Sequence, residues 1–122
     1  MMLLLDSSVW IEYLAGGAKA GLIERSLGRP ADILTPTIVL YEVYKKLKRE
    51  RGEEAALYAA AQLHQTRIEP LDDSLALSAG DISLAYGIPM ADAIVAATAK
   101  AFDARILTLD EDFRRVPWAE VL

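Results

Sequence analysis

The chain has 122 residues, which is the length of one domain with a core of its own. It is 53% hydrophobic and 25% charged, and this composition excludes a disordered or a fibrous protein. The formal net charge of −5 argues against a protein that coats nucleic acid by overall attraction. We therefore expect a single globular domain over residues 1–122.

The absence of cysteine excludes disulfides, thiolate zinc sites and cysteine nucleophiles. The first residues have no basic segment and reach Asp6 after a short apolar run, so they resemble neither a signal peptide nor a membrane anchor. No apolar stretch approaches the roughly 18 residues that are needed to cross a bilayer. From these features we expect a cytoplasmic protein.

Short apolar runs alternate with segments of helical periodicity along the whole chain. In chain order the expected elements are a strand at residues 3–5, helices at 9–15 and 19–27, a strand at 33–34, helices at 36–51 and 53–64, a strand or extended turn at 67–71, helices at 74–86 and 90–102, a strand at 105–109 and an edge strand at 118–122. This alternation predicts a parallel sheet that is covered by helices on both faces, and the fold class is therefore α/β.

Several of these boundaries depend on capping residues. Thr35-Pro36 predicts a helix with Thr35 as N-cap and proline at the first helical position, and Gly52 predicts its end. In the alanine-rich helix that follows, Leu57, Tyr58 and Leu63 are the side chains expected to pack.

Four single carboxylates lie next to or within apolar segments. They are Asp6, Glu42, Asp92 and Asp110. A charge enters a core only at a high free-energy cost, so acids on separate buried elements predict a shared polar cleft. Because like charges repel, such a cluster needs a cation, and the pattern therefore indicates a metal site.

Each acid also has an ordinary structural interpretation. Asp6 is a good helix cap, although Asp110 likewise follows an apolar strand, and ligands bind at the carboxyl ends of parallel strands. Glu42 precedes Lys46 by four residues, the usual spacing of a surface ion pair. Asp92 falls in the first turn of a helix, where the helix dipole favours an anion.

Basic and aromatic residues also allow two interpretations. Residues 45–51 contain five of the 13 basic side chains, which are either a solvated helix face or RNA contacts; the candidates for contact are Lys45, Lys46 and Arg49. The chain's aromatic residues are interpreted as core or interface residues rather than base-stacking platforms; those considered are Trp10, Tyr13, Tyr41, Tyr44 and Trp118. His64, the only histidine, is interpreted as a surface or hydrogen-bonded residue.

Taken together, the acidic segments resemble those of the PIN-domain ribonucleases, especially the VapC-like toxins of prokaryotic toxin-antitoxin pairs. The segments are Leu3-Leu4-Leu5-Asp6-Ser7-Ser8-Val9, Thr35-Pro36 ahead of Glu42, Gly87-Ile88-Pro89-Met90-Ala91-Asp92-Ala93 and Ile106-Leu107-Thr108-Leu109-Asp110-Glu111-Asp112-Phe113. The resemblance implies a three-layer α/β/α fold with a short, mainly parallel sheet, RNA cleavage that depends on Mg²⁺ or Mn²⁺, a homodimer and a cognate antitoxin.

The resemblance also assigns roles to particular residues. It implies a catalytic quartet of Asp6, Glu42, Asp92 and Asp110, of which Asp6, Asp92 and Asp110 bind metal. Supporting residues are Ser8 and Thr108, which match positions where the family tends to keep a small hydroxyl residue, and Asp112. Many relatives have Asn at the position of Asp110 and an acid further on, so the fourth acid is either Asp110, which we favour, or Asp112.

Three other functions remain open at this stage. A general RNA-processing PIN nuclease would use the same chemistry in another biological role. A receiver-like signalling module shares the length, the α/β sheet and a Mg²⁺-binding acidic pocket, but it needs a phosphoacceptor Asp after a central strand and a Lys after a late one, and the sequence supplies neither convincingly. A catalytically silent domain that only binds protein partners is the third.

Overall fold

The computed structural model describes residues 2–122. In chain order its elements are β1 (Leu3–Leu5), α1 (Ser7–Leu14), α2 (Ala20–Ser26), the 3-10 helix η1 (Pro30–Asp32), β2 (Ile33–Pro36), α3 (Thr37–Arg51), α4 (Glu53–Leu63), β3 (Arg67–Glu69), α5 (Asp73–Tyr86), α6 (Met90–Ala101), β4 (Arg105–Thr108), the 3-10 helix η2 (Glu111–Arg115) and β5 (Ala119–Val121). Every predicted strand and helix is present, and η1 and η2 are additional.

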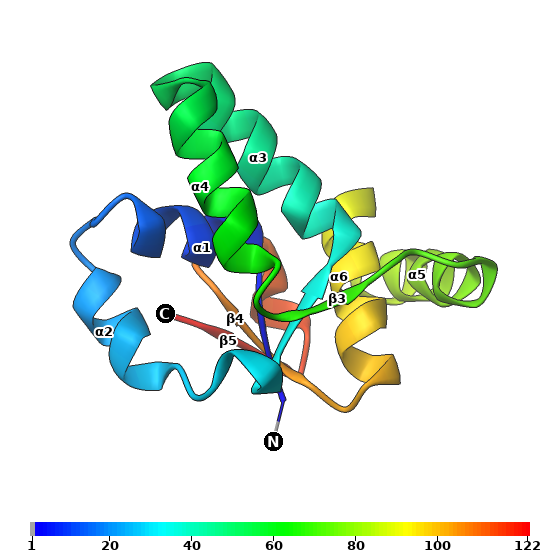
Figure 1. The fold of residues 1–122 in the computed structure, drawn as a ribbon. Coiled ribbons are helices and arrows are strands. Elements are labelled where there is room, and N and C mark those ends of the chain that lie inside the picture. Colours follow the sequence, from blue (N-terminus) through cyan, green and yellow to red (C-terminus); the bar gives the residue numbers. More distant parts are fainter. Residues whose placement is uncertain (1) are drawn as a thin grey trace.

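The five strands form one parallel sheet in the order β3-β2-β1-β4-β5. In Figure 1, α1, α2 and α4 lie on one side of this sheet and α5 and α6 on the other. The three-layer α/β/α arrangement expected from the sequence is therefore confirmed. The central strand β1 pairs with β2 and β4, so the carboxyl ends of β1 and β4 lie side by side.

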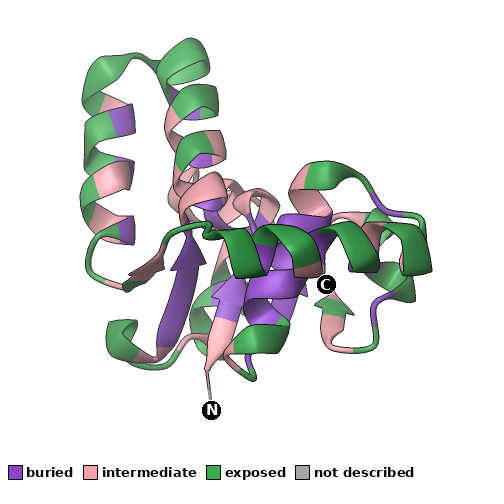
Figure 2. Ribbon diagram, turned by 90° about the vertical axis from the view of Figure 1, so that its right-hand side faces the viewer, coloured by how far each residue is buried: buried purple, intermediate pink, exposed green. Residues whose placement is uncertain are grey.

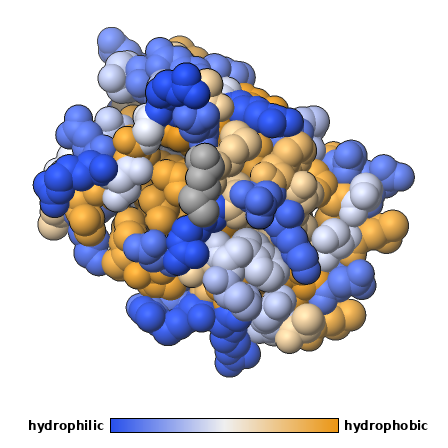
Figure 3. Space-filling view, turned by 90° about the horizontal axis from the view of Figure 1, so that it is seen from below, coloured by the Kyte–Doolittle hydropathy of each residue, from blue (hydrophilic) through white to orange (hydrophobic). Residues whose placement is uncertain are grey.

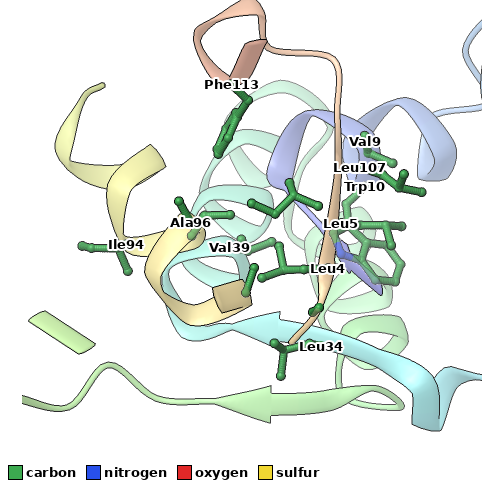
Figure 4. Close-up of a cluster of buried hydrophobic side chains, with 14 of the residues drawn as sticks. Leu4, Leu5, Val9, Trp10, Leu34, Val39, Ile94, Ala96, Leu107 and Phe113 are labelled. Atoms are coloured by element: carbon green, nitrogen blue, oxygen red, sulfur yellow. The ribbon is translucent and has the colours of Figure 1, made fainter. Parts of the chain in front are cut away.

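The core lies between the sheet and the helices on both faces (Figure 4). Leu4 and Leu34 are fully buried in neighbouring strands, and Phe113 of η2 is fully buried as well. Helix α6 is enclosed on all sides, because every residue from 93 to 99 is buried. Figure 2 shows this helix in purple behind the largely exposed α5. The small side chains of α6 thus allow close packing.

Helices α3 and α4 form an antiparallel hairpin that projects from the sheet (Figure 1). As predicted, Gly52 ends α3, and its φ of 93° is a conformation that other residues rarely adopt. The packing prediction for α4 is right only for Leu63, which is fully buried, because Leu57 and Tyr58 are 54% and 62% exposed. Alanines pack in their place, as Ala56 and Ala59 are buried.

The predicted cap of α3 is wrong by one residue. Pro36 is the N-cap, and Thr35 lies in β2, fully buried. The hydroxyl of Thr35 is 2.6 Å from that of Thr66, which itself donates to the carbonyl of Leu63. Thr35 therefore donates to Thr66 and connects β2 to the end of α4 instead of capping a helix.

Within residues 2–122, no single helix is long and apolar enough to cross a bilayer. Only α5 and α6 taken together pass a test of length and composition, and they are bent by 113° relative to each other. Figure 3 views the molecule from below, the side from which β1 starts, and there hydrophilic and hydrophobic residues are interspersed.

Candidate metal centre

Four chain segments bring acidic side chains to the carboxyl edge of the sheet. Asp6 directly follows β1, and Asp110 follows the neighbouring strand β4. Helix α3 packs against both α1 and α6, and it carries Glu42, while Asp92 lies in the first turn of α6. The acids predicted from the sequence to converge thus lie together at the carboxyl edge of the sheet, where parallel sheets bind ligands, and this group of acids is called the acidic cleft below.

Asp6 is the most buried of these acids, with 5% of its surface exposed. Its Oδ1 accepts hydrogen bonds from the amide of Val9 at 3.2 Å and the hydroxyl of Ser8 at 2.5 Å, and its Oδ2 accepts one from the hydroxyl of Thr108 at 2.5 Å. Burial raises the pKa of Asp6, these hydrogen bonds oppose the rise, and the charge of Asp110 adds to it. Asp6 therefore caps α1 and also lies in the cleft.

The hydroxyl groups of Ser8 and Thr108 connect the ends of β1 and β4. Thr108 donates to Asp6 and accepts from the amide of Asp110 at 2.9 Å. Ser8 also donates to Asp6 and accepts from the amide of Leu109 at 3.0 Å. Each hydroxyl thus donates one hydrogen bond and accepts one, and the two hydroxyls fix the position of Asp6 relative to the turn that carries Asp110.

Asp92, Asp110 and Asp112 form the tightest acidic cluster in the described part of the chain. One carboxylate oxygen from each lies within 4.8 Å of the others. Asp110 is the N-cap of η2, and its Oδ1 accepts a hydrogen bond from the amide of Asp112 at 2.9 Å. The short helix η2 therefore brings both acids close to Asp92. Asp110 and Asp112 both stay candidates for the fourth acid.

Asp92 is half-buried, and its pKa is raised to about 7. Loss of solvation contributes most to this rise, followed by the negative charges of Asp110, Asp112 and Asp6. The pKa shows that the surroundings of Asp92 disfavour its charged form at neutral pH. A cation at this position would reverse that preference.

Glu42 is half-buried on the face of α3 that turns toward the cleft. Burial raises its pKa, a hydrogen bond from Ser7 lowers it, and the charges of Asp6 and Asp110 raise it further. Among residues 2–122 no ion pair joins Glu42 to Lys46, so the surface-pair interpretation is wrong. Ser7 was not among the predicted site residues, because all three residues of Asp6-Ser7-Ser8 are equally good capping residues.

The donors in this cleft are suited to one class of metal. They are carboxylate and hydroxyl oxygens, which hard cations such as Mg²⁺ and Mn²⁺ prefer, and the chain has no cysteine. Two carboxylates about 4 Å apart repel by roughly 4 kcal/mol at an effective dielectric of 20. A divalent cation removes this repulsion, so the residues present fit the group that the sequence predicts.

The lysine and arginine candidates for RNA contact lie on the same helix as Glu42. Lys45, Lys46 and Arg49 are exposed and follow Glu42 by three, four and seven residues, so they share its side of α3. Of the aromatic residues interpreted as core, Trp10 is buried, whereas Tyr41 is 55% exposed and Tyr44 is only half-buried. His64 is exposed, as expected.

Comparison with solved structures identifies similar folds. A chain from a toxin-antitoxin complex of Klebsiella pneumoniae matches with a TM-score of 0.83 and 21% identity, covering 98% of this chain and 96% of that one. VapC20 of Mycobacterium tuberculosis, described as a toxin that cleaves the sarcin-ricin loop, matches with a TM-score of 0.80 and 25% identity, covering 98% of both chains. VapBC2 of Rickettsia felis, bound to a promoter DNA fragment, gives a TM-score of 0.79 at 17% identity over 100% of this chain and 99% of that chain.

A search of curated protein sequences gave no match. The PIN domain family matches residues 3–119, a segment that includes every acid of the cleft. This match agrees with the parallel sheet, the order of the acidic segments and the similar folds described above. The chain therefore belongs to the PIN domain family.

Proposed function

We propose that this protein is an endoribonuclease dependent on Mg²⁺ or Mn²⁺ and that it is the toxin of a toxin-antitoxin pair. The observation that carries the proposal is the convergence of Asp92, Asp110 and Asp112 within 4.8 Å, beside the buried Asp6, in a PIN-domain chain. The choice of RNA rests on the 25% identity to VapC20, which is described as cleaving the sarcin-ricin loop. We place the reaction in the cytoplasm, which agrees with the absence of cysteine.

In this proposal Asp92 and Asp110 hold the cation together with Asp6, and Asp112 supports them. When bound, the cation lowers the pKa of a coordinated water and neutralises charge on the phosphoryl oxygens. Glu42, with its raised pKa, orients the attacking water and takes up its proton. Thr108 and Ser8 hold Asp6 in place through the hydrogen bonds described above.

The RNA backbone would leave the cleft along α3. Lys45, Lys46 and Arg49 form a positively charged stripe that starts one turn after Glu42. In the described residues no carboxylate forms an ion pair with Lys45 or Lys46. Phosphate groups are therefore their natural counter-ions, although the whole protein is acidic.

A homodimer is supported by a groove between α5 and α6. It has a volume of about 500 Å³ and is lined by Leu71, Ala76, Ala79, Gly80, Ser83, Leu84, Met90, Ala93 and Ile94. Leu84 is 88% exposed and Met90 is 74% exposed, so large apolar side chains stand beside a groove floored by small ones. The same face thus offers both projections and a hollow, as a twofold interface requires. We expect Leu84→Asp to convert a dimer into monomers in light-scattering measurements.

A cognate antitoxin is the second proposed partner. It is supported by the similar folds, which include chains from toxin-antitoxin complexes of Klebsiella pneumoniae and Rickettsia felis. Co-expression with the product of a neighbouring small reading frame tests this partner. The antitoxin should co-purify with the toxin and suppress its nuclease activity.

The nuclease proposal is tested with purified protein and labelled RNA. Wild type should cleave the RNA in Mn²⁺ or Mg²⁺ and not in EDTA, whereas Asp92→Asn and Asp6→Asn should be inactive. Equal cleavage by wild type and both variants would identify a contaminating nuclease. A stable, folded wild type that cleaves no RNA in either metal would contradict the proposal and leave the partner-binding alternative.

A further inference from the structure

Two separate segments of the chain carry the acids that approach one another most closely. Asp92 belongs to the first turn of α6, whereas Asp110 and Asp112 belong to η2 and its cap. One oxygen from each of the three lies within 4.8 Å of the others. When ionised, carboxylates at such distances repel one another, so the charged acids do not hold the two segments together. Other contacts therefore set the distance between α6 and η2.

Buried side chains in and after η2 attach this segment to the rest of the fold. Phe113 is fully buried, and Figure 4 shows it directed from η2 toward the core. Trp118, which follows η2, donates its indole N–H to the carbonyl of Ala96 in α6 at 3.0 Å. The ring of Trp118 also meets the ring of Tyr86 edge to face, with the centroids 5.7 Å apart. These contacts fix the general place of η2 beside α5 and α6.

Arg115 adds a polar contact between η2 and the end of α5. It is the last residue of η2, and its Nη1 donates to the carbonyl of Tyr86 at 3.4 Å. Tyr86 is the last residue of α5. The last carbonyls of a helix have no partner within the helix, and they carry the negative end of its dipole. A guanidinium is therefore well suited to this position.

The turn between α5 and α6 leaves room for this guanidinium. Gly87 has a φ of 65°, and a Cβ atom added there would lie 3.3 Å from the Nη1 of Arg115. The turn is held on its other side as well, because the hydroxyl of Ser83 donates to the carbonyl of Ile88 at 2.8 Å and Ile88 is buried. Helix α6 follows this turn, with Asp92 near its start. Arg115 thus contacts the segment that leads into Asp92.

The charge of Arg115 is not spent on a carboxylate. In the part of the chain that the structure describes, Arg115 takes part in no ion pair, whereas its neighbour Arg114 pairs with Glu111. Burial and neighbouring negative charges raise the pKa of Asp92 to about 7, so the guanidinium does not neutralise that acid. Any influence of Arg115 on the acids is therefore exerted through their position.

We propose that Arg115 is a positioning residue of the metal site, which holds η2 at the distance from α6 at which the acids of the two segments meet around one cation. The inference rests on the metal-dependent function proposed above and names a residue that sets the geometry of its site. Residues that orient metal ligands without touching the metal typically change metal affinity by roughly 10- to 100-fold when they are replaced.

Direct measurement of Mn²⁺ binding to the purified protein tests this role without RNA. Arg115→Met keeps the unbranched part of the side chain but loses the donor, and it should weaken Mn²⁺ binding about tenfold. Arg115→Lys keeps a charged donor and should recover part of the lost affinity. Arg114→Met is the matched control, because Arg114 is also exposed on η2 but pairs with Glu111. It should bind Mn²⁺ at least as tightly as wild type.

The direction of the change separates position from charge. Both methionine variants remove one positive charge from η2, so electrostatics alone would leave the attraction of the acids for Mn²⁺ unchanged or make it stronger. A loss of affinity that is confined to Arg115→Met supports positioning. Mn²⁺ binding by Arg115→Met that is as tight as in wild type, or tighter, would overturn the proposal. An equal loss in Arg114→Met would overturn it as well.

Melting curves and RNA cleavage complete the test. In EDTA, Arg115→Met should melt close to wild type, because Phe113 and Trp118 still attach η2 to the fold. If this variant does not fold, Arg115→Ala takes its place with the same expected loss of Mn²⁺ affinity. The Mn²⁺ concentration that gives half-maximal RNA cleavage should rise by the same factor as the dissociation constant for Mn²⁺.

The positioning role and the metal site fail in different ways. A folded wild type that binds no Mn²⁺ overturns the metal site and the role of Arg115 with it. A wild type that binds Mn²⁺ no more tightly than Arg115→Met does overturns the role of Arg115 alone.

Discussion

The two halves of the acidic cleft hold their carboxylates in opposite ways. On the strand side, Asp6 is buried and receives hydrogen bonds from two hydroxyls and one amide. On the helix side, Asp92 is half-buried among the negative charges of Asp110, Asp112 and Asp6, and its pKa is raised to about 7. The first arrangement serves both the fold and the site, while the second is unfavourable until a cation arrives. The difference teaches that burial alone does not identify the metal-binding part of a site.

Replacing Asp6 or Asp92 should have the largest effect, which is on RNA cleavage. The melting temperatures of the two variants should then distinguish the strand side of the cleft from the helix side. Asp6→Ala and Asp92→Ala should each reduce RNA cleavage by about a hundredfold or more. In EDTA at pH 8, Asp6→Ala should melt at a lower temperature, since it loses a helix cap worth about 1 kcal/mol. Asp92→Ala should melt at the same or a higher temperature, because a disfavoured charge is removed. Equal destabilisation by both variants would contradict the comparison.

Metal binding should distinguish the helix side of the cleft from the strand side more clearly. A metal concentration about 100 times the dissociation constant stabilises a protein by roughly 2.7 kcal/mol. Titration of wild type with Mg²⁺ or Mn²⁺ should therefore raise the melting temperature, and Asp92→Asn should remove most of this rise. The control for charge screening is a Ca²⁺-free buffer in which Na⁺ replaces the divalent metal at matched ionic strength. A wild type whose melting is indifferent to millimolar metal would refute the metal site.

Removing the Thr108 hydroxyl, which connects β1 to β4, should have a smaller effect, mainly on the free energy of unfolding. Thr108→Val keeps the shape of the side chain but leaves Asp6 and the amide of Asp110 each without one partner. The expected loss of unfolding free energy is about 1–3 kcal/mol, together with weaker metal binding. Thr98→Val is the matched control, because Thr98 is equally buried but its hydroxyl only returns to the carbonyl of Ile94. It should leave metal binding unchanged.

The smallest expected effect is a pH dependence of the metal-free protein. The pKa of Asp92 rises from 3.8 to about 7 in the folded state, so the folded protein holds a proton that the unfolded chain releases. The contribution of this bound proton to the free energy of unfolding is therefore complete below about pH 4 and is lost as the pH rises through about 7. Urea unfolding in EDTA between these pH values should show that the free energy of unfolding falls less with rising pH for Asp92→Asn than for wild type. If the free energies of unfolding of the two proteins fell in parallel as the pH rose, Asp92 would not be the source of the pH dependence.

Much of the fold was predictable because local signals mark the ends of its elements. Gly52 and Gly87 adopt positive φ where α3 and α5 end, and the side chain of Asp72 caps α5. The order of the strands was not predictable in this way, because it depends on packing between distant segments. The exposure of Leu57 is a similar case, since the pattern of an alanine-rich helix does not show that its alanines face the partner helix.

The candidate site was predictable to the level of its acids but not of their arrangement. An acid after an apolar strand marks Asp6 and Asp110, yet only the fold shows that η2 also turns Asp112 toward Asp92. Ser7 had no signal that distinguished it from its neighbours in a capping sequence. Tyr41 was interpreted as a core or interface residue, and its exposure depends on how α3 and α4 pack.

Anomalous scattering from crystals grown with Mn²⁺ tests the central claim most directly. The expected result is a peak bounded by the carboxylates of Asp92, Asp110 and Asp112 and by Asp6, which disappears in crystals of Asp92→Asn grown under the same conditions. Manganese found only at other surface carboxylates, with none in this cleft, would contradict the account.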